Sequence, residues 1–98
     1  MEKVLEKIKV YNCESPATGR EVANQFIICI YGKNGTKQVF QSYNSVIAVK
    51  ENGKVYLDRN KWDYSVTTGR YRNQFLGENI AETRKKIADG TYTLCDLN

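Results

Sequence analysis

The feature that most constrains the fold is an alternation of side chains with a period of two, which runs from Phe26 to Asp58 and is broken only at turn residues. Successive side chains of a β-strand point to opposite faces, so this period indicates strands. The pairs Asn34-Gly35 and Asn52-Gly53 tolerate the positive φ that tight hairpins need. The stretch therefore predicts an antiparallel meander of four strands, at residues 26–31, 37–43, 45–50 and 54–58.

Weaker patterns on either side extend this sheet. The run 26–31 is apolar on both faces, which predicts a central strand covered by a helix on at least one side. Ile8 and Val10 alternate with polar neighbours and predict an earlier strand, whereas residues 13–24, with a proline and a glycine, are expected to form a loop. The alternation returns over residues 91–97 and predicts a last strand.

Two short helices are predicted between the meander and the last strand. Thr67 or Thr68 can cap a helix over residues 69–76. Asn79 precedes Glu82 by three residues, which is the spacing of a capping box, and this starts a second helix. The chain is therefore predicted to be a single α+β domain, with an antiparallel sheet of about five or six strands and two short helices packed on one face.

The chain of 98 residues contains no histidine, which removes the commonest general base near neutral pH and the usual zinc and nucleophile partner. Its three cysteines have no C-x-x-C spacing, and Cys29 and Cys95 are expected to be buried small apolar residues. The carboxylate pairs Asp58 with Asp63 and Glu78 with Glu82 are the remaining candidates for acid–base or metal chemistry, although the second pair has the ordinary spacing of an exposed helical face. We expect a protein that is not an enzyme, with no cofactor and no metal.

The distribution of charged and apolar residues indicates where in the cell the protein is expected and which partners its charge favours. Residues 1–10 carry a charge at every second or third position, and the sequence holds no apolar run of about 18 residues, so we expect a cytoplasmic protein without a membrane partner. The formal net charge is +4, and its bases are interleaved with acids. This mixing is more typical of a solvated surface than of a phosphate-binding face.

The candidate functional segment is residues 62–76, which has the densest set of hydrogen-bonding side chains and the only tryptophan. Hydroxyl groups at a helix start and nearby arginines can bind an anion, and tyrosines can anchor a partner. The alternative is structural, with threonine caps, aromatic core residues and solvated arginines. The candidate binding residues are Tyr64, Ser65, Thr67, Thr68, Arg70, Tyr71, Arg72 and Asn73.

Two further functions remain open from the residues alone. A strip of Lys33, Lys37, Lys50 and Lys54 with Arg70 and Arg72, beside exposed tyrosines, would make the chain a small nucleic-acid-binding protein. An anion site at Thr67 and Thr68 would instead sequester a small nucleotide. Exposed sheet edges also favour a homodimer formed through a strand edge.

Several short motifs carry a resemblance to a known group of proteins. They are the S-Y-N of residues 42–44, the W-D-Y-S-V-T-T of residues 62–68, N-Q-F-L at 73–76 and E-T-R at 82–84. Over about residues 39–97 the chain resembles a family of small uncharacterised proteins carried by bacteriophages and other mobile elements, and residues 1–25 lie outside this likeness. The resemblance implies an accessory protein made in an infected bacterium. We therefore expect a non-catalytic protein that binds a host protein, such as an inhibitor of a CRISPR nuclease or another defence system.

Overall fold

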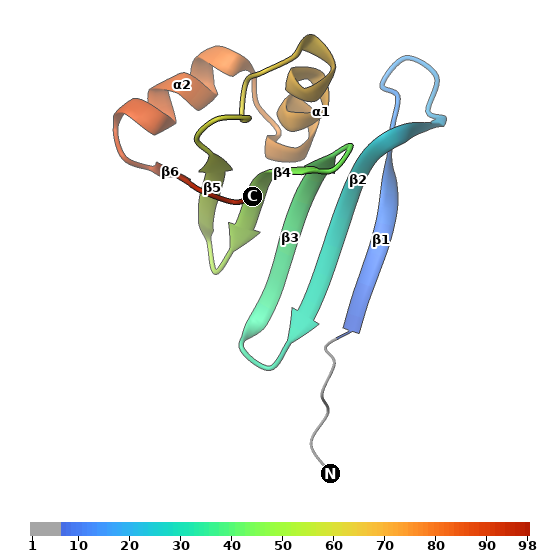
Figure 1. Ribbon diagram of the computed structural model, residues 1–98, viewed down its shortest axis with the longest axis horizontal. Coiled ribbons are helices and arrows are strands. Elements are labelled where there is room, and N and C mark those ends of the chain that lie inside the picture. Colours follow the sequence, from blue (N-terminus) through green and yellow to red (C-terminus); the bar gives the residue numbers. More distant parts are fainter. Residues whose placement is uncertain (1–6) are drawn as a thin grey trace.

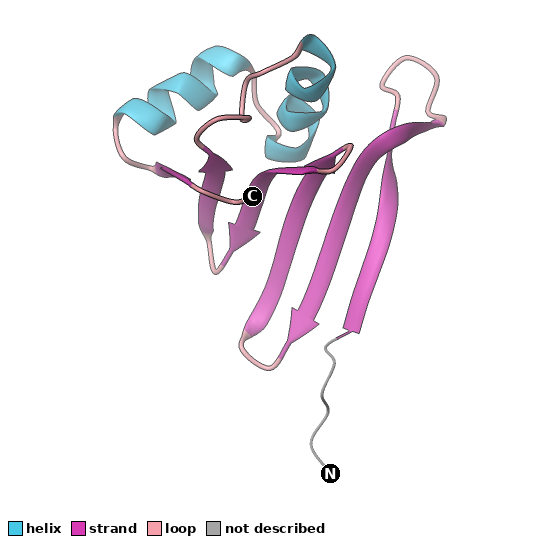
Figure 2. Cartoon of the chain, viewed as in Figure 1, coloured by secondary structure: helices cyan, strands magenta, loops and turns pink. Residues whose placement is uncertain are grey.

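The computed structural model describes residues 7–98 as a six-stranded sheet with two helices (Figures 1 and 2). The strands lie side by side in sequence order, so the predicted α+β meander is confirmed. The first six residues of the charged segment 1–10 lie outside the described part. The elements are β1 (Lys7–Glu14), β2 (Glu21–Gly32), β3 (Gly35–Ser42), β4 (Ser45–Glu51), β5 (Lys54–Asp58), α1 (Val66–Leu76), α2 (Ile80–Ala88) and β6 (Tyr92–Cys95).

Turn residues determine where the meander reverses. Asn52 and Gly53 have φ values of 52° and 75° between β4 and β5, and two consecutive positive angles match the right-handed twist of the flanking strands. Gly35, at the start of β3, has a φ of 120°, which only glycine adopts without strain. Both predicted hairpins are therefore present, with their glycines at positions that need them.

The predicted loop over residues 13–24 is shorter in the structure. β1 continues to Glu14 and β2 begins at Glu21, so the expectation of a loop is wrong at both of its ends. A β-bulge between Asn12 and Glu14 interrupts the pairing, and the Asn12 side-chain amide donates to the Val22 carbonyl oxygen at 3.0 Å. Polar side chains and the bulge mask the alternation of apolar and polar residues in this part of the sequence. The two strands nevertheless stay paired through their backbones.

β6 departs from the antiparallel pattern. It pairs in parallel with β5, in the register Val55 to Tyr92 and Leu57 to Leu94, so the expectation of a purely antiparallel sheet is wrong at this pair. The connection between these two strands contains both helices, and a crossover of this length returns the chain in the same direction.

Both helices pack on one face of the sheet, which we call the helix face. Phe40 pairs with Ala48, which pairs with Leu57, and all three side chains are fully buried there. The ring of Phe75 in α1 stacks on Phe40 with centroids 6.0 Å apart. A bulge in β4 leaves Ile47 as an extra residue that is also fully buried. These contacts form the hydrophobic core.

β2 is not the central strand that its composition predicts. It lies second from the edge, between β1 and β3, while the helices pack mainly on β3, β4 and β6 (Figure 1). Its helix-face residue Cys29 is 5% exposed, as expected for a small buried cysteine, but Cys95 is only half-buried. The apolar side chains on the opposite face of β2 have no helix above them.

Candidate functional site

The start of α1 is set by Ser65 rather than by a threonine. Ser65 has extended backbone angles and its hydroxyl oxygen accepts a hydrogen bond from the Thr68 amide at 3.1 Å, so the expected cap at Thr67 or Thr68 is wrong. Thr68 lies inside the helix, 1% exposed, with its hydroxyl 2.9 Å from that of Ser42 on β3. The hydroxyl of Thr68 thereby ties the helix to the sheet.

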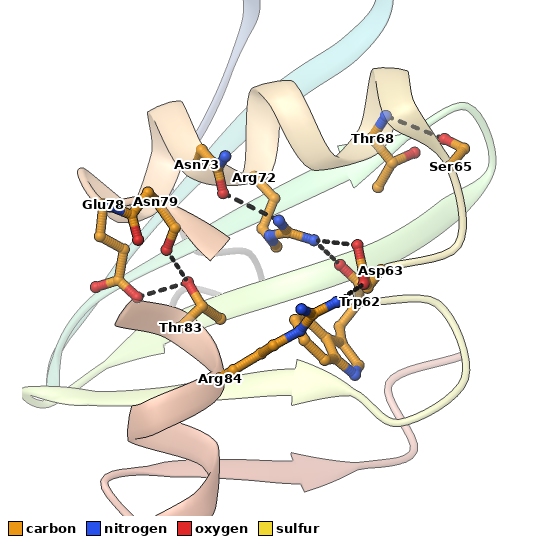
Figure 3. A network of polar contacts seen from close by, with 10 residues as sticks. All are labelled: Trp62, Asp63, Ser65, Thr68, Arg72, Asn73, Glu78, Asn79, Thr83 and Arg84. Carbon is orange, nitrogen blue, oxygen red and sulfur yellow. Dashed lines mark hydrogen bonds and ion pairs between the residues drawn. The ribbon is translucent and has the colours of Figure 1, made fainter. Parts of the chain in front are cut away.

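Arg72 is the buried cation of this region (Figure 3). It is 1% exposed, and its Nη1 donates to the Trp62 carbonyl oxygen at 2.6 Å and to Asp63 Oδ1 at 3.1 Å. Nη2 donates to Asn73 Oδ1 at 3.0 Å, and the guanidinium carbon lies 5.3 Å from the centroid of the Trp62 ring. Arg72 therefore holds the loop after β5 against α1 through its two terminal nitrogens, while its buried Nε has no hydrogen-bond partner among the described residues.

Asp63 joins this contact to the second helix. Its Oδ2 lies 3.4 Å from Nη2 of Arg84 in α2, whose side chain is 65% exposed. Arg72 and Arg84 thus approach the same carboxylate from two helices (Figure 3). One acidic side chain with two cations leaves this corner of the molecule with a positive balance.

A second polar cluster lies where α1 meets α2. The carboxylate of Glu78 accepts hydrogen bonds from Thr83 at 2.6 Å, Lys86 at 2.7 Å and the Tyr92 hydroxyl at 2.7 Å. Burial alone would raise the pKa of Glu78, but these three donors outweigh it and the pKa is lowered. Asn79 and Glu82 form the predicted capping box next to it, which is confirmed.

An open hollow of about 610 Å³ lies beside the Arg72 contact. Tyr64 and Val66 stand at it with exposed fractions of 48% and 83%, and Arg70 is exposed next to them. The rest of its lining consists of Asp63, Ser65, Gly69, Arg72, Asn73 and Ile80. The hollow therefore has the buried Arg72 in its lining, together with an exposed aromatic, an exposed aliphatic and an exposed cationic side chain.

The structure brings together five of the eight candidate binding residues. They are Tyr64, Ser65, Arg70, Arg72 and Asn73, all of which line the hollow. Thr68 and Tyr71 are buried and do not line the hollow, and Tyr71 is a core residue as in the structural alternative, whereas Thr68 is not the cap which that alternative expected. Thr67 is exposed on α1 but does not line the hollow either.

Sequence reasoning missed four residues that line the hollow. Asp63, Val66 and Gly69 belong to the candidate segment, but Asp63 was considered only as a carboxylate paired with Asp58, and nothing in the pattern marked Val66 or Gly69. Ile80 comes from the other helix, and only the packing of α2 beside α1 places it there.

The residues of the proposed basic strip are dispersed. Lys37 and Lys54 both neighbour Glu51 in the strand register, on the face opposite the helices. Lys50, one position from Glu51, points to the helix face, where its ammonium donates to the Phe75 carbonyl oxygen and lies 4.5 Å from the centre of that ring. Arg72 is buried as described. The structure does not gather these cations into one strip.

The carboxylates considered for chemistry have structural partners. Asp58 is 3% exposed and accepts from the backbone amides of Asn60 and Leu97. Burial raises the pKa of Asp58, but hydrogen bonds to the carboxylate outweigh it and the pKa is lowered. Among residues 7–98, no cluster of three or more cysteine or acidic side chains is arranged to hold a metal ion. Within the same range, neither helix has the length and apolar character needed to cross a membrane.

A model described as a family of unknown function (DUF8033) matches residues 11–90. The matched span begins within β1 and includes all of β2, and both strands lie upstream of the motifs that carry the resemblance. Neither the comparison with curated proteins nor that with solved structures found a match.

Proposed function

Since the chain belongs to this family of unknown function (DUF8033), we propose from its surface that it is a non-catalytic protein that binds a protein partner at the hollow beside α1. The observation that carries the proposal is the contrast between the base and the rim of the hollow. At its base, both terminal nitrogens of the Arg72 guanidinium donate hydrogen bonds within the protein, and the Asn73 side-chain oxygen accepts one of them, whereas Tyr64 and Val66 are exposed. Exposed apolar and aromatic side chains beside internally bonded polar groups are suited to a protein contact.

The side chains at the rim support a protein partner over a nucleic acid. Tyrosine and arginine are enriched among the residues that dominate binding energy at protein interfaces. Arg70 is exposed at the hollow and Arg84 lies close by, so a partner with acidic side chains would be matched in charge. A nucleic acid requires many cations along one track, and the lysines of the sheet point to different faces.

The setting follows from the resemblance to proteins of bacteriophages and mobile elements. In that setting the protein acts in the cytoplasm of the host cell, and its partner is a host protein. Components of host defence, such as a CRISPR nuclease, are the first class to test. Stoichiometric inhibition suits a small chain whose carboxylates are engaged in structural hydrogen bonds.

The test is affinity capture from bacterial lysate with the tagged protein, followed by measurement of binding to the purified candidate. Tyr64→Ala and Arg70→Glu change the rim of the hollow and leave the Arg72 contact intact. We expect each to weaken binding by about tenfold or more, since buried anchor residues of this kind contribute about 1–2 kcal/mol or more.

Matched controls lie at the other end of the sheet. Tyr31→Ala, in β2, matches Tyr64→Ala, and Lys33→Glu, in the turn after β2, matches the charge reversal of Arg70→Glu. Both positions are exposed, and we expect these controls to bind as the wild type does. The proposal fails if no protein partner binds at micromolar concentration, or if the hollow variants bind as tightly as the controls. Binding to RNA or DNA with a steep salt dependence would favour the nucleic-acid function instead.

A further inference from the structure

The face of the sheet opposite the helices is apolar across five strands. Cross-strand register places Val10, Ile28, Val39, Val49 and Tyr56 in one row from β1 to β5. Ile8 and Ile30 pair on the same face in the next row, and Phe26 lies in the row on the other side. We call this surface, formed by these eight side chains, the open face.

No described segment covers the open face. The core cluster under the helices contains Phe40, Ala48 and Leu57, whose side chains point the other way. Ile8 and Val10, on the edge strand, remain 56% and 60% exposed, whereas Val39 in the middle of the row is 8% exposed and the other five side chains are half-buried. An antiparallel sheet with one solvated face normally shows polar residues on that face, so an apolar row across five strands has the pattern of a sheet that packs on a second layer.

We propose that the open face is the contact between two copies of this chain, which pack sheet against sheet as a homodimer. Five strands about 4.8 Å apart and two rows of side chains about 6.7 Å apart, without the row that contains the lysines and the glutamate, give a patch of roughly 24 by 13 Å, or about 310 Å² in projection. The side chains that stand out from the sheet increase its accessible area toward the roughly 800 Å² per partner of a stable dimer. A monomer rarely exposes an apolar patch of more than a few hundred Å².

The distribution of charge fits a second copy. Three charged residues of this face, Lys37, Glu51 and Lys54, lie in the row that also contains Ile8 and Ile30, beside the hairpin turns. Lys37 and Glu51 form an ion pair of 2.9 Å. Outside this row, strand alternation places Asp58 on the same face at the end of β5, but it is 3% exposed and accepts hydrogen bonds from two backbone amides, so the other two rows expose no charged side chain. Two copies can therefore meet through these uncharged rows without burying an unpaired charge, and the charged row stays at the rim.

This arrangement differs from a dimer through a strand edge. Pairing of two β1 edges would lengthen the sheet and leave the open face uncovered, whereas face-to-face packing buries it. It is also separate from the hollow beside α1, which lies on the helix side of the molecule. A dimer through the open face would present two hollows facing outward.

Sedimentation equilibrium of the purified chain between about 1 and 200 µM tests the proposal. We expect a species of twice the 11.3 kDa chain mass. Val10→Lys and Val49→Lys each place a charge on the open face, on an edge strand and on an inner strand, and we expect each to weaken the dimer by roughly a hundredfold. Tyr11→Lys is the matched control, because Tyr11 is 49% exposed on the opposite face of the same strand.

Two outcomes of the sedimentation experiment would contradict the proposal. A monomer at all concentrations overturns the proposal. A dimer that survives Val49→Lys also overturns it and favours edge pairing. Isotope-filtered NMR of a mixed-label wild-type sample gives an answer that needs no variant to fold. Contacts between copies that join methyl groups of Ile28, Val39 and Val49 support the proposal, and contacts confined to the β1 backbone contradict it.

Discussion

The guanidinium of Arg72 lies over the ring of Trp62, 5.3 Å from its centroid, and the same side chain donates a 2.6 Å hydrogen bond to the Trp62 carbonyl oxygen. The chain thus folds back between the end of β5 and α1 around one buried cation. The hydrogen bonds of Arg72 to Asp63 and Asn73 complete this contact and form the base of the hollow. The shape of the proposed binding surface depends on a charge that solvent does not reach.

Replacement of Arg72 by alanine should destabilise the protein strongly. It removes the partners of the Trp62 carbonyl and the Asn73 side chain and leaves a cavity, so we expect a loss of about 2–4 kcal/mol in the free energy of unfolding. Arg70→Ala, on the exposed side of the same helix, should change it by less than about 0.5 kcal/mol. Urea denaturation of both variants measures the difference, and equal stabilities would show that the buried contact contributes little.

Gly69→Ala should stabilise α1. Gly69 lies in the helix, and a β-carbon there would be 3.6 Å from Nη2 of Arg72, which is an ordinary contact distance. Alanine reduces the entropy of the unfolded chain and has the higher helix propensity, so we expect a gain of about 0.5–1 kcal/mol. Gly53→Ala is the contrasting change, because the φ of +75° at that turn should make it destabilising. A lower thermal midpoint for Gly69→Ala would mean that the added methyl group displaces the Arg72 guanidinium.

The buried hydroxyl pair of Ser42 and Thr68 should act as a coupled unit. Thr68→Val leaves the Ser42 hydroxyl without its partner in a site that is 0% exposed, and we expect a loss of about 1–2 kcal/mol. Ser42→Ala should cost a similar amount, and the double variant should lose less than the sum of the two. A double-mutant cycle on unfolding free energies measures this coupling, and strict additivity would contradict it.

The pH dependence of stability should reflect Glu78. Its pKa is lowered from the model-compound value of 4.5, because hydrogen bonds from Lys86, Thr83 and Tyr92 outweigh the opposing effect of burial. A carboxyl group whose pKa is lower in the folded state stabilises the fold above its unfolded-state pKa, and this contribution disappears as the pH falls through the folded-state value. We therefore expect wild-type stability to fall between about pH 5 and about pH 3.

Glu78→Gln supplies the control for this dependence. The variant should be less stable than the wild type at neutral pH and should lose less stability on acidification, since the titrating group is gone. Asp58, whose pKa is also lowered, remains in the variant and should leave a residual slope. Identical slopes for the two proteins would exclude Glu78 as a contributor.

Local signals in the sequence were sufficient for most of the elements. The Asn52-Gly53 turn and the Asn79–Glu82 capping box depend on residues within a few positions of one another, so the hairpin and the helix start are both present as predicted. The start of α1 was predicted two or three residues late, because Ser65, Thr67 and Thr68 are all competent caps. Only the packing of Thr68 against Ser42 selects among them.

The sequence by itself determined the meander, the two helices and the class of the fold, since side-chain alternation, capping and turn conformation act over short distances along the chain. The tertiary structure alone decided that β6 runs parallel to β5, that Arg72 is buried, and that Ile80 lines the same hollow as Tyr64. It also decided which apolar face of β2 remains uncovered. These outcomes depend on how segments distant in sequence pack into one core. A chain of this length has only enough helix to cover one face of the sheet.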